Sequence, residues 1–162
     1  MVDTKVGPLL ERLRERVTRA NPAAFAEVEQ LDVLHHELEA CSRAVTDADR
    51  HVADAISATR TRQAEIMFSL SELRSEDQWD AKTSAQRDAC VRELTQVTEA
   101  LNAELEKLHD AQIIAAAQVS TADDGFRAGC QRLADQLRAI ASDPDAFLDP
   151  IAVLEAVVAR GA

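Results

Sequence analysis

The chain has 162 residues, a formal net charge of −11, and only four glycines and four prolines. Aromatic residues make up 3% of it, and no proline lies between Pro22 and Pro144. A single domain's length with so few turn-forming residues excludes sandwich, barrel and repeated βαβ architectures and favours an all-α fold.

The first predicted helix spans residues 5–20 and is amphipathic. Leu9 widens an apolar stripe whose members follow at steps of four, three and four: Val6, Leu10, Leu13 and Val17. Asn21 and Pro22 are then typical of an N-cap and a first helical residue. The pattern leaves open whether the chain breaks at this point or kinks within one longer helix.

The second predicted helix spans residues 23–74. Its apolar or small residues alternate at steps of three and four, which is typical of a helix packed lengthwise along another. We call these inward-facing positions the seam. In this helix the seam is Val28, Leu31, Leu34, Leu38, Cys41, Val45, Ala48, Val52, Ile56, Thr59, Gln63, Ile66, Leu70 and Leu73.

The third predicted helix spans residues 77–142, with Ser75 as its N-cap. Its seam is Cys90, Leu94, Val97, Leu101, Leu105, Leu108, Gln112, Ala115, Val119, Ala122, Phe126, Cys130, Leu133, Leu137 and Ile140. Gly125 and Gly129 allow two interpretations: either Thr121 caps a new helix, or one helix continues at a cost of about 1 kcal/mol for each glycine.

Irregular spacings predict the register of the two long helices. Each seam contains a place where two steps of four are adjacent, at Val52 in the first and at Leu101 in the second. If these places meet, facing residue numbers add up to about 153, so that Leu31 faces Ala122 and Leu34 faces Val119. Leu137 would then face a residue near Arg16, and the first helix would extend the pairing past Pro22. The prediction is an elongated antiparallel coiled-coil hairpin.

A short amphipathic helix is predicted at residues 147–160, and residues 1–162 form a single helical domain. Several apolar residues fall outside the seams: Phe25, Val33, Met67, Phe68, Val91, Ile113, Ile114 and Val153. Because exposed apolar surface is unfavourable, we expect a third helical layer to cover them. The chain ends, a second copy or a different protein could supply that layer.

The sequence contains no phosphate-binding loop, dinucleotide fingerprint, nucleophile elbow or zinc motif. The acid-x-x-His pattern occurs twice, in Asp32 with His35 and in Glu106 with His109, but the predicted register separates the two pairs. We interpret them as surface residues, and His35 and His36 as an exposed, inert pair. No enzyme activity, metal or cofactor is expected.

The three cysteines, Cys41, Cys90 and Cys130, are far apart and odd in number. We expect them to be reduced thiols that pack as small apolar residues, which favours a cytoplasmic protein. No apolar run is long enough to span a membrane, and the first residues lack the apolar core of a signal peptide.

Charge narrows the choice of partners. Residues 1–21 carry a net charge of +2 while the rest of the chain is acidic, so nucleic acid is not expected as a partner. The basic first helix has no aromatic anchor, which favours docking onto the acidic hairpin or onto a partner protein over contact with a membrane.

These observations predict a non-enzymatic coiled-coil scaffold, adaptor or complex subunit that binds proteins through helix faces and forms a homodimer. The candidate partner-binding residues are Leu9, Leu13, Arg16, Trp79, Ile151, Leu154 and Val158. Two alternatives remain. One is a membrane-binding helical dimer in the manner of BAR domains, and the other is an acidic helical chaperone of assembling or secreted subunits, with residues 150–160 as its clamp.

Overall fold

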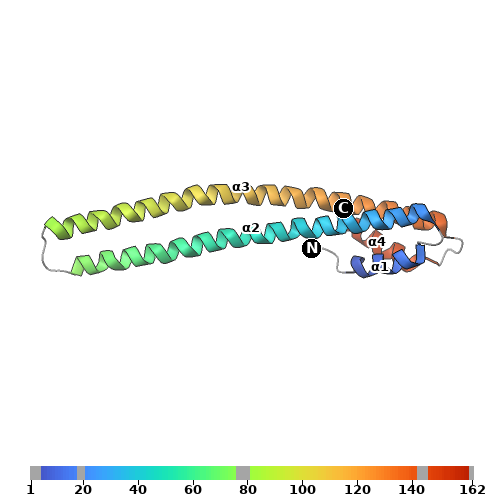
Figure 1. Cartoon of the computed structure of the whole chain (residues 1–162), viewed down its shortest axis with the longest axis horizontal. Coiled ribbons are helices and arrows are strands. Elements are labelled where there is room, and N and C mark those ends of the chain that lie inside the picture. Colours follow the sequence, from blue (N-terminus) through green and yellow to red (C-terminus); the bar gives the residue numbers. More distant parts are fainter. Residues whose placement is uncertain (1–4, 18–20, 76–80, 142–145, 161–162) are drawn as a thin grey trace. The chain divides into compact units, whose positions relative to one another are not determined.

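The computed structural model describes residues 5–17, 21–75, 81–141 and 146–160. Within these ranges the fold is all-α, without strands, as the sequence predicts. The helices are α1 (Val6–Val17), α2 (Pro22–Ser75), α3 (Ala81–Ile140) and α4 (Leu148–Ala159) (Figure 1). The predicted pair of long helices between two short terminal ones is confirmed. Trp79, one of the candidate partner-binding residues, lies outside the described residues.

The chain divides into two compact units. The first consists of residues 1–45 together with 115–162, and the second of residues 46–114. Helices α2 and α3 therefore contribute to both units, whereas α1 and α4 belong to the first unit alone.

The first unit holds the main hydrophobic core. All five residues of the predicted stripe on α1 are buried there, and α1 and α4 contact each other. The largest fully buried side chains are Phe126, Leu13, Leu31, Leu133, Leu137, Leu154, Val6, Val17, Val28 and Cys130, which come from all four helices. In this unit the chain's own ends therefore supply the third helical layer.

The junction between α1 and α2 is a true helix boundary. The Asn21 side chain accepts hydrogen bonds from the backbone N–H groups of Ala23, at 3.0 Å, and Ala24, at 3.3 Å. Pro22 is the first residue of α2. The predicted N-cap is thus confirmed, because its carboxamide oxygen satisfies donors that the first helical turn leaves unpaired.

After this boundary the chain direction reverses, so α1 runs antiparallel to α2. Arg14 contacts Glu29 and Asp32, and a Cβ atom placed on Gly7 would lie 3.8 Å from His35 Cε1. The prediction that the first helix extends the pairing with the second long helix is wrong. The reversal lets the apolar stripe of α1 join a core built from several helices instead of facing α3 alone.

In the second unit α2 and α3 pair antiparallel. Gln63 Nε2 donates to Thr98 Oγ1 at 3.1 Å, and Gln112 Nε2 donates to Asp49 Oδ1 at 2.8 Å. In each pair the two residue numbers add up to 161. Nearer the turn, the Arg87 guanidinium contacts the Leu73 carbonyl oxygen, with Nε donating at 3.2 Å, and this contact continues the same register.

The predicted pairing of Val52 with Leu101 is therefore wrong by about one heptad, or roughly 10 Å along the axis. The described part of α2 extends through Ser75, and that of α3 begins at Ala81. Ser75 accordingly belongs to α2 and is not the N-cap of α3. A shift of seven residues leaves the same seam facing inward, which is why periodicity did not expose the error.

The two glycines of α3 show the corrected register in the first unit. A Cβ atom on Gly125 would lie 3.8 Å from Leu34 Cδ2, and one on Gly129 would lie 3.0 Å from Cδ1 of both Leu31 and Leu34. These leucines therefore pack against glycines, not against Ala122 and Val119 as predicted. Helix α3 continues through both glycines, so the alternative of a new helix capped by Thr121 is wrong.

We predict opposite outcomes for alanine at these two glycines. Gly125→Ala should raise the free energy of unfolding by about 0.5–1 kcal/mol, because alanine favours the helix and the site has room. Gly129→Ala should leave the free energy of unfolding unchanged or lower it, since the new methyl group would press on two leucine side chains. Urea denaturation of both variants measures the difference. Equal stabilisation by the two substitutions would contradict the close packing at Gly129.

Candidate interaction groove between α1 and α4

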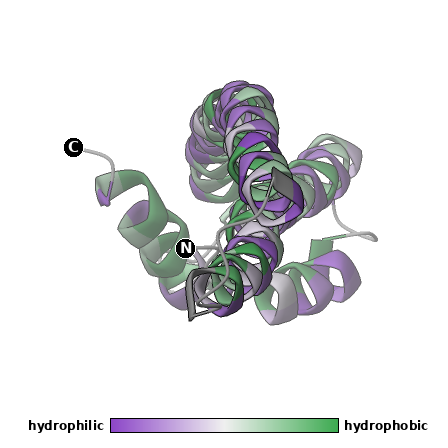
Figure 2. Ribbon diagram, turned by 90° about the vertical axis from the view of Figure 1, so that its left-hand side faces the viewer, coloured by the Kyte–Doolittle hydropathy of each residue, from purple (hydrophilic) through white to green (hydrophobic). Residues whose placement is uncertain are grey.

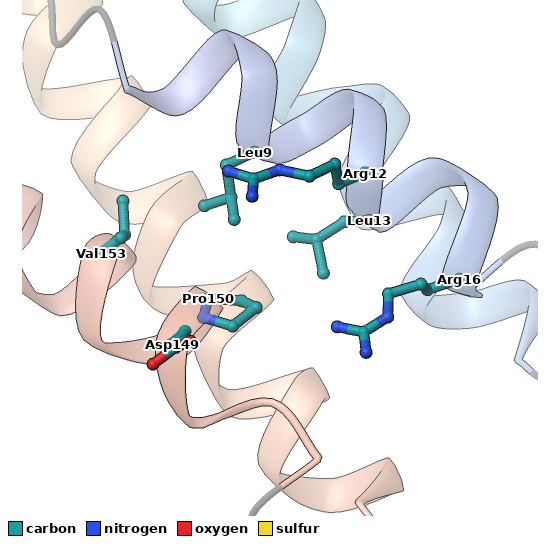
Figure 3. A pocket seen from close by; sticks show the side chains of 7 residues that line it. All are labelled: Leu9, Arg12, Leu13, Arg16, Asp149, Pro150 and Val153. Carbon is teal, nitrogen blue, oxygen red and sulfur yellow. The ribbon is translucent and has the colours of Figure 1, made fainter.

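A pocket of about 150 Å³ opens between α1 and α4 in the first unit (Figure 3). The side chains that line it are Leu9, Arg12, Leu13, Arg16, Asp149, Pro150 and Val153. It therefore combines an apolar floor with charged groups from both helices. We call it the α1–α4 groove.

The floor of the α1–α4 groove is apolar because amphipathic helices meet there. Leu9 and Leu13 are buried members of the α1 stripe, and Pro150 is buried in the first turn of α4. Val153 packs against the same core while keeping part of its surface exposed. Helix α4 is hydrophobic along most of its length (Figure 2) and contributes Pro150 and Val153 to the apolar part of the lining.

Two exposed arginines of α1 stand over this floor. Arg12 and Arg16 are one helical turn apart, and Figure 3 shows both guanidinium groups at the groove. Arg12 Nε donates to the Pro8 carbonyl oxygen at 3.2 Å, which orients its side chain. Asp149 lies on the α4 side, in a first turn where a carboxylate complements the helix dipole. Among the described residues, no ion pair joins Asp149 to either arginine.

Arg14 of the same helix has a structural role. Its guanidinium donates to Glu29 and, at 3.1 Å, to Asp32, both on α2. These hydrogen bonds, that to Glu29 first, raise the pKa of Arg14 above its usual value. The arginines of α1 therefore divide by function: Arg14 fastens the helix to α2, and Arg12 and Arg16 face the groove.

The structure brings three predicted partner-binding residues together in the α1–α4 groove: Leu9, Leu13 and Arg16. The other three described candidates lie on α4, where Leu154 is fully buried and Ile151 and Val158 are half-buried against the core. Trp79 lies outside the described residues.

Four residues of the groove are not among the predicted partner-binding residues: Arg12, Asp149, Pro150 and Val153, although Pro150 and Val153 fall within the alternative clamp of residues 150–160. Arg12 carries a local signal, because it lies four residues before Arg16 on a helix. The three α4 residues carry none, since their proximity to α1 arises only from tertiary packing.

His35 is a correction to the sequence prediction of an exposed histidine pair. Its side chain is only 7% exposed, its ring centroid lies 5.6 Å from that of Phe126, and its Nε2 has no hydrogen-bond partner among the described residues. His36 is exposed, with Nδ1 2.8 Å from the Asp32 carbonyl oxygen. The folding of α1 onto α2 near Gly7 explains the burial of His35.

The described residues contain no cluster of three or more histidine, cysteine or acidic side chains that could hold a metal ion. Glu106 and His109 are exposed on α3. Cys130 is fully buried, and Cys41 and Cys90 are half-buried free thiols. In the part of the chain that the structure describes, no helix combines the length and apolar character needed to cross a membrane.

Comparisons of this chain with protein-family models, curated proteins and solved structures found no match. Its function must therefore be inferred from its own residues.

We predict that Arg14→Gln loosens α1 from α2, because Glu29 and Asp32 lose their cationic partner. Amide hydrogen exchange should become faster in residues 6–17 and stay unchanged in residues 50–70. Arg16→Gln is the matched control on the same helix and should leave the exchange of α1 as it is. Equal exchange rates in the two variants would contradict the assigned role of Arg14.

Proposed function

We propose that this chain is a non-enzymatic coiled-coil interaction module, a scaffold, adaptor or complex subunit, that associates with other proteins through helix faces. The observation that carries this proposal is the group of large apolar side chains left more than half exposed in the second unit: Met67, Phe68, Val91, Ile113 and Ile114. Exposed large apolar side chains mark protein interaction sites where they gather on one face.

One flank of the second unit is polar, and it shows how α2 and α3 are oriented. Arg62 donates to Glu93 across this flank, and Ser69 and Gln86 line one shared groove there. Each of these four residues comes directly before a residue that faces the other helix. In an antiparallel pair, equivalent positions of the two helices lie on the same flank.

The opposite flank carries an exposed apolar patch. Met67 and Val91 come directly after the seam residues Ile66 and Cys90, so the same geometry places both on this side. Their residue numbers add up to 158, close to the sum of 161 for facing residues, so Met67 and Val91 lie at nearly the same height along the helix pair. Met67, Phe68 and Val91 are 51%, 65% and 51% exposed. We call Met67 and Val91, together with Phe68 next to Met67 in the sequence, the apolar flank.

A second copy of the chain is the simplest partner for the apolar flank. A two-fold axis brings the same patch of each copy together, so that apolar side chains on both sides are covered at once. Burial of this surface is favourable at about 25 cal/mol per Å². The odd number and wide spacing of the three cysteines in the sequence favour a reducing, cytoplasmic location for such a module.

We predict that the chain forms a homodimer through the apolar flank. Static light scattering should give twice the chain mass of 17.7 kDa, and Met67→Glu with Val91→Glu should give a monomer, because each copy then brings two carboxylates into the contact. Both substituted positions are exposed, so circular dichroism should show an unchanged helix content.

The matched control is Ser69→Glu with Gln86→Glu, which adds the same charge to exposed positions of the polar flank. This variant should remain a dimer. A monomeric wild-type chain at every concentration would remove the homodimer from the proposal, and loss of the dimer in both variants would remove the apolar flank as its interface.

A further inference from the structure

The α1–α4 groove has the size of a site for one side chain. Its volume of about 150 Å³ is of the order that holds a single benzene-sized apolar group. Leu9, Leu13, Pro150 and Val153 supply the apolar contacts. An apolar side chain of an incoming peptide fits this description better than a larger cofactor or ligand, which needs a pocket of several hundred Å³.

The charges at the rim favour a carboxylate beside that apolar group. Arg12 and Arg16 project from one face of α1, and a guanidinium binds a carboxylate through two parallel hydrogen bonds. Neither arginine forms an ion pair with another described residue, in contrast to Arg14. With Asp149 opposite them, the two arginines leave the groove lining with a net charge of +1 on a chain whose net charge is −11, so an acidic segment would be steered to this place.

The site is also held in position before a ligand arrives. Arg12 is oriented by its hydrogen bond to the Pro8 carbonyl oxygen, and α1 is fastened to α2 by Arg14. Leu9 and Leu13 are fixed within the core. Fewer groups therefore lose freedom on binding, which favours affinity.

An anionic membrane fits the groove less well than a peptide. Surface-binding helices need bulky apolar anchors on an exposed face, but the apolar stripe of α1 is buried. Negatively charged lipids reward clusters of four or more basic residues, whereas the groove offers two arginines on an acidic chain.

We infer that the α1–α4 groove binds an acidic, apolar peptide segment of a partner protein. One apolar side chain enters the pocket, and a neighbouring aspartate or glutamate of the segment pairs with Arg12 and Arg16. This inference rests on the proposed interaction function and names the chemistry of a partner at a site separate from the apolar flank.

The test uses a random dodecapeptide library displayed on phage and selected on the intact, immobilised chain. Enriched peptides should place aspartate or glutamate beside leucine, isoleucine, methionine or phenylalanine. Synthetic, fluorescein-labelled copies are then titrated by fluorescence anisotropy. Arg12→Ala with Arg16→Ala should weaken their binding about tenfold or more, since charge-assisted hydrogen bonds to two arginines are lost. Both positions are exposed, so the fold should persist, as circular dichroism can verify.

The matched control is Arg43→Ala with Arg60→Ala, which removes the same charge from exposed positions of α2 and should bind the peptides like the wild-type chain. Three results would overturn the inference: no enriched peptide, peptides that bind both double variants equally, or flotation with phosphatidylglycerol vesicles that depends on Arg12 and Arg16 while no peptide binds. If the chain is a dimer but binds no peptide, only this inference is contradicted. If the chain is a monomer and binds acidic peptides through Arg12 and Arg16, this inference stands and only the predicted homodimer is contradicted.

Discussion

The antiparallel register of α2 against α3 is the constraint on which both units depend. In the first unit it places Leu31 and Leu34 over Gly129, where the missing side chain leaves room for both leucine side chains. In the second unit it brings Gln63 to Thr98, a polar contact within a largely apolar seam. Polar seam residues specify register because a shifted alignment would leave them without partners. The positions of the core and of the exposed faces follow from this alignment.

Two paired helices bury only a narrow apolar seam, so apolar side chains outside the seam stay exposed unless something else covers them. The two units differ in how these side chains are covered. In the first unit, α1 and α4 cover the pair and complete a core around Phe126, Leu133 and Leu137. The α1–α4 groove is a product of that covering layer. In the second unit the apolar flank stays exposed, which is the basis of the proposed association. The small buried area of a two-helix pair thus accounts for a closed core in one unit and an open apolar surface in the other.

Periodicity predicts which side of each helix faces inward, because that property repeats locally. The buried stripe of α1 and the N-cap at Asn21 could therefore be predicted from sequence. The register could not, since a heptad shift keeps the same seam inward. The direction of α1 relative to α2 depends on tertiary packing, which is why the sequence wrongly predicted an exposed His35. The groove was predicted only in part: Leu13 and Arg16 lie on a recognisable amphipathic helix, whereas Pro150 meets them only after folding.

Cross-linking of engineered cysteine pairs tests the register most directly. In a background with the three native cysteines replaced by alanine, one variant carries cysteines at Asp49 and Gln112, and a second carries them at Val52 and Leu101. A short bifunctional maleimide should join the first pair rapidly within one chain, because these side chains are in hydrogen-bond contact. The second pair should react slowly, being offset by about one heptad, or roughly 10 Å along the axis. Rapid joining of Val52 to Leu101 together with slow joining of Asp49 to Gln112 would contradict the account.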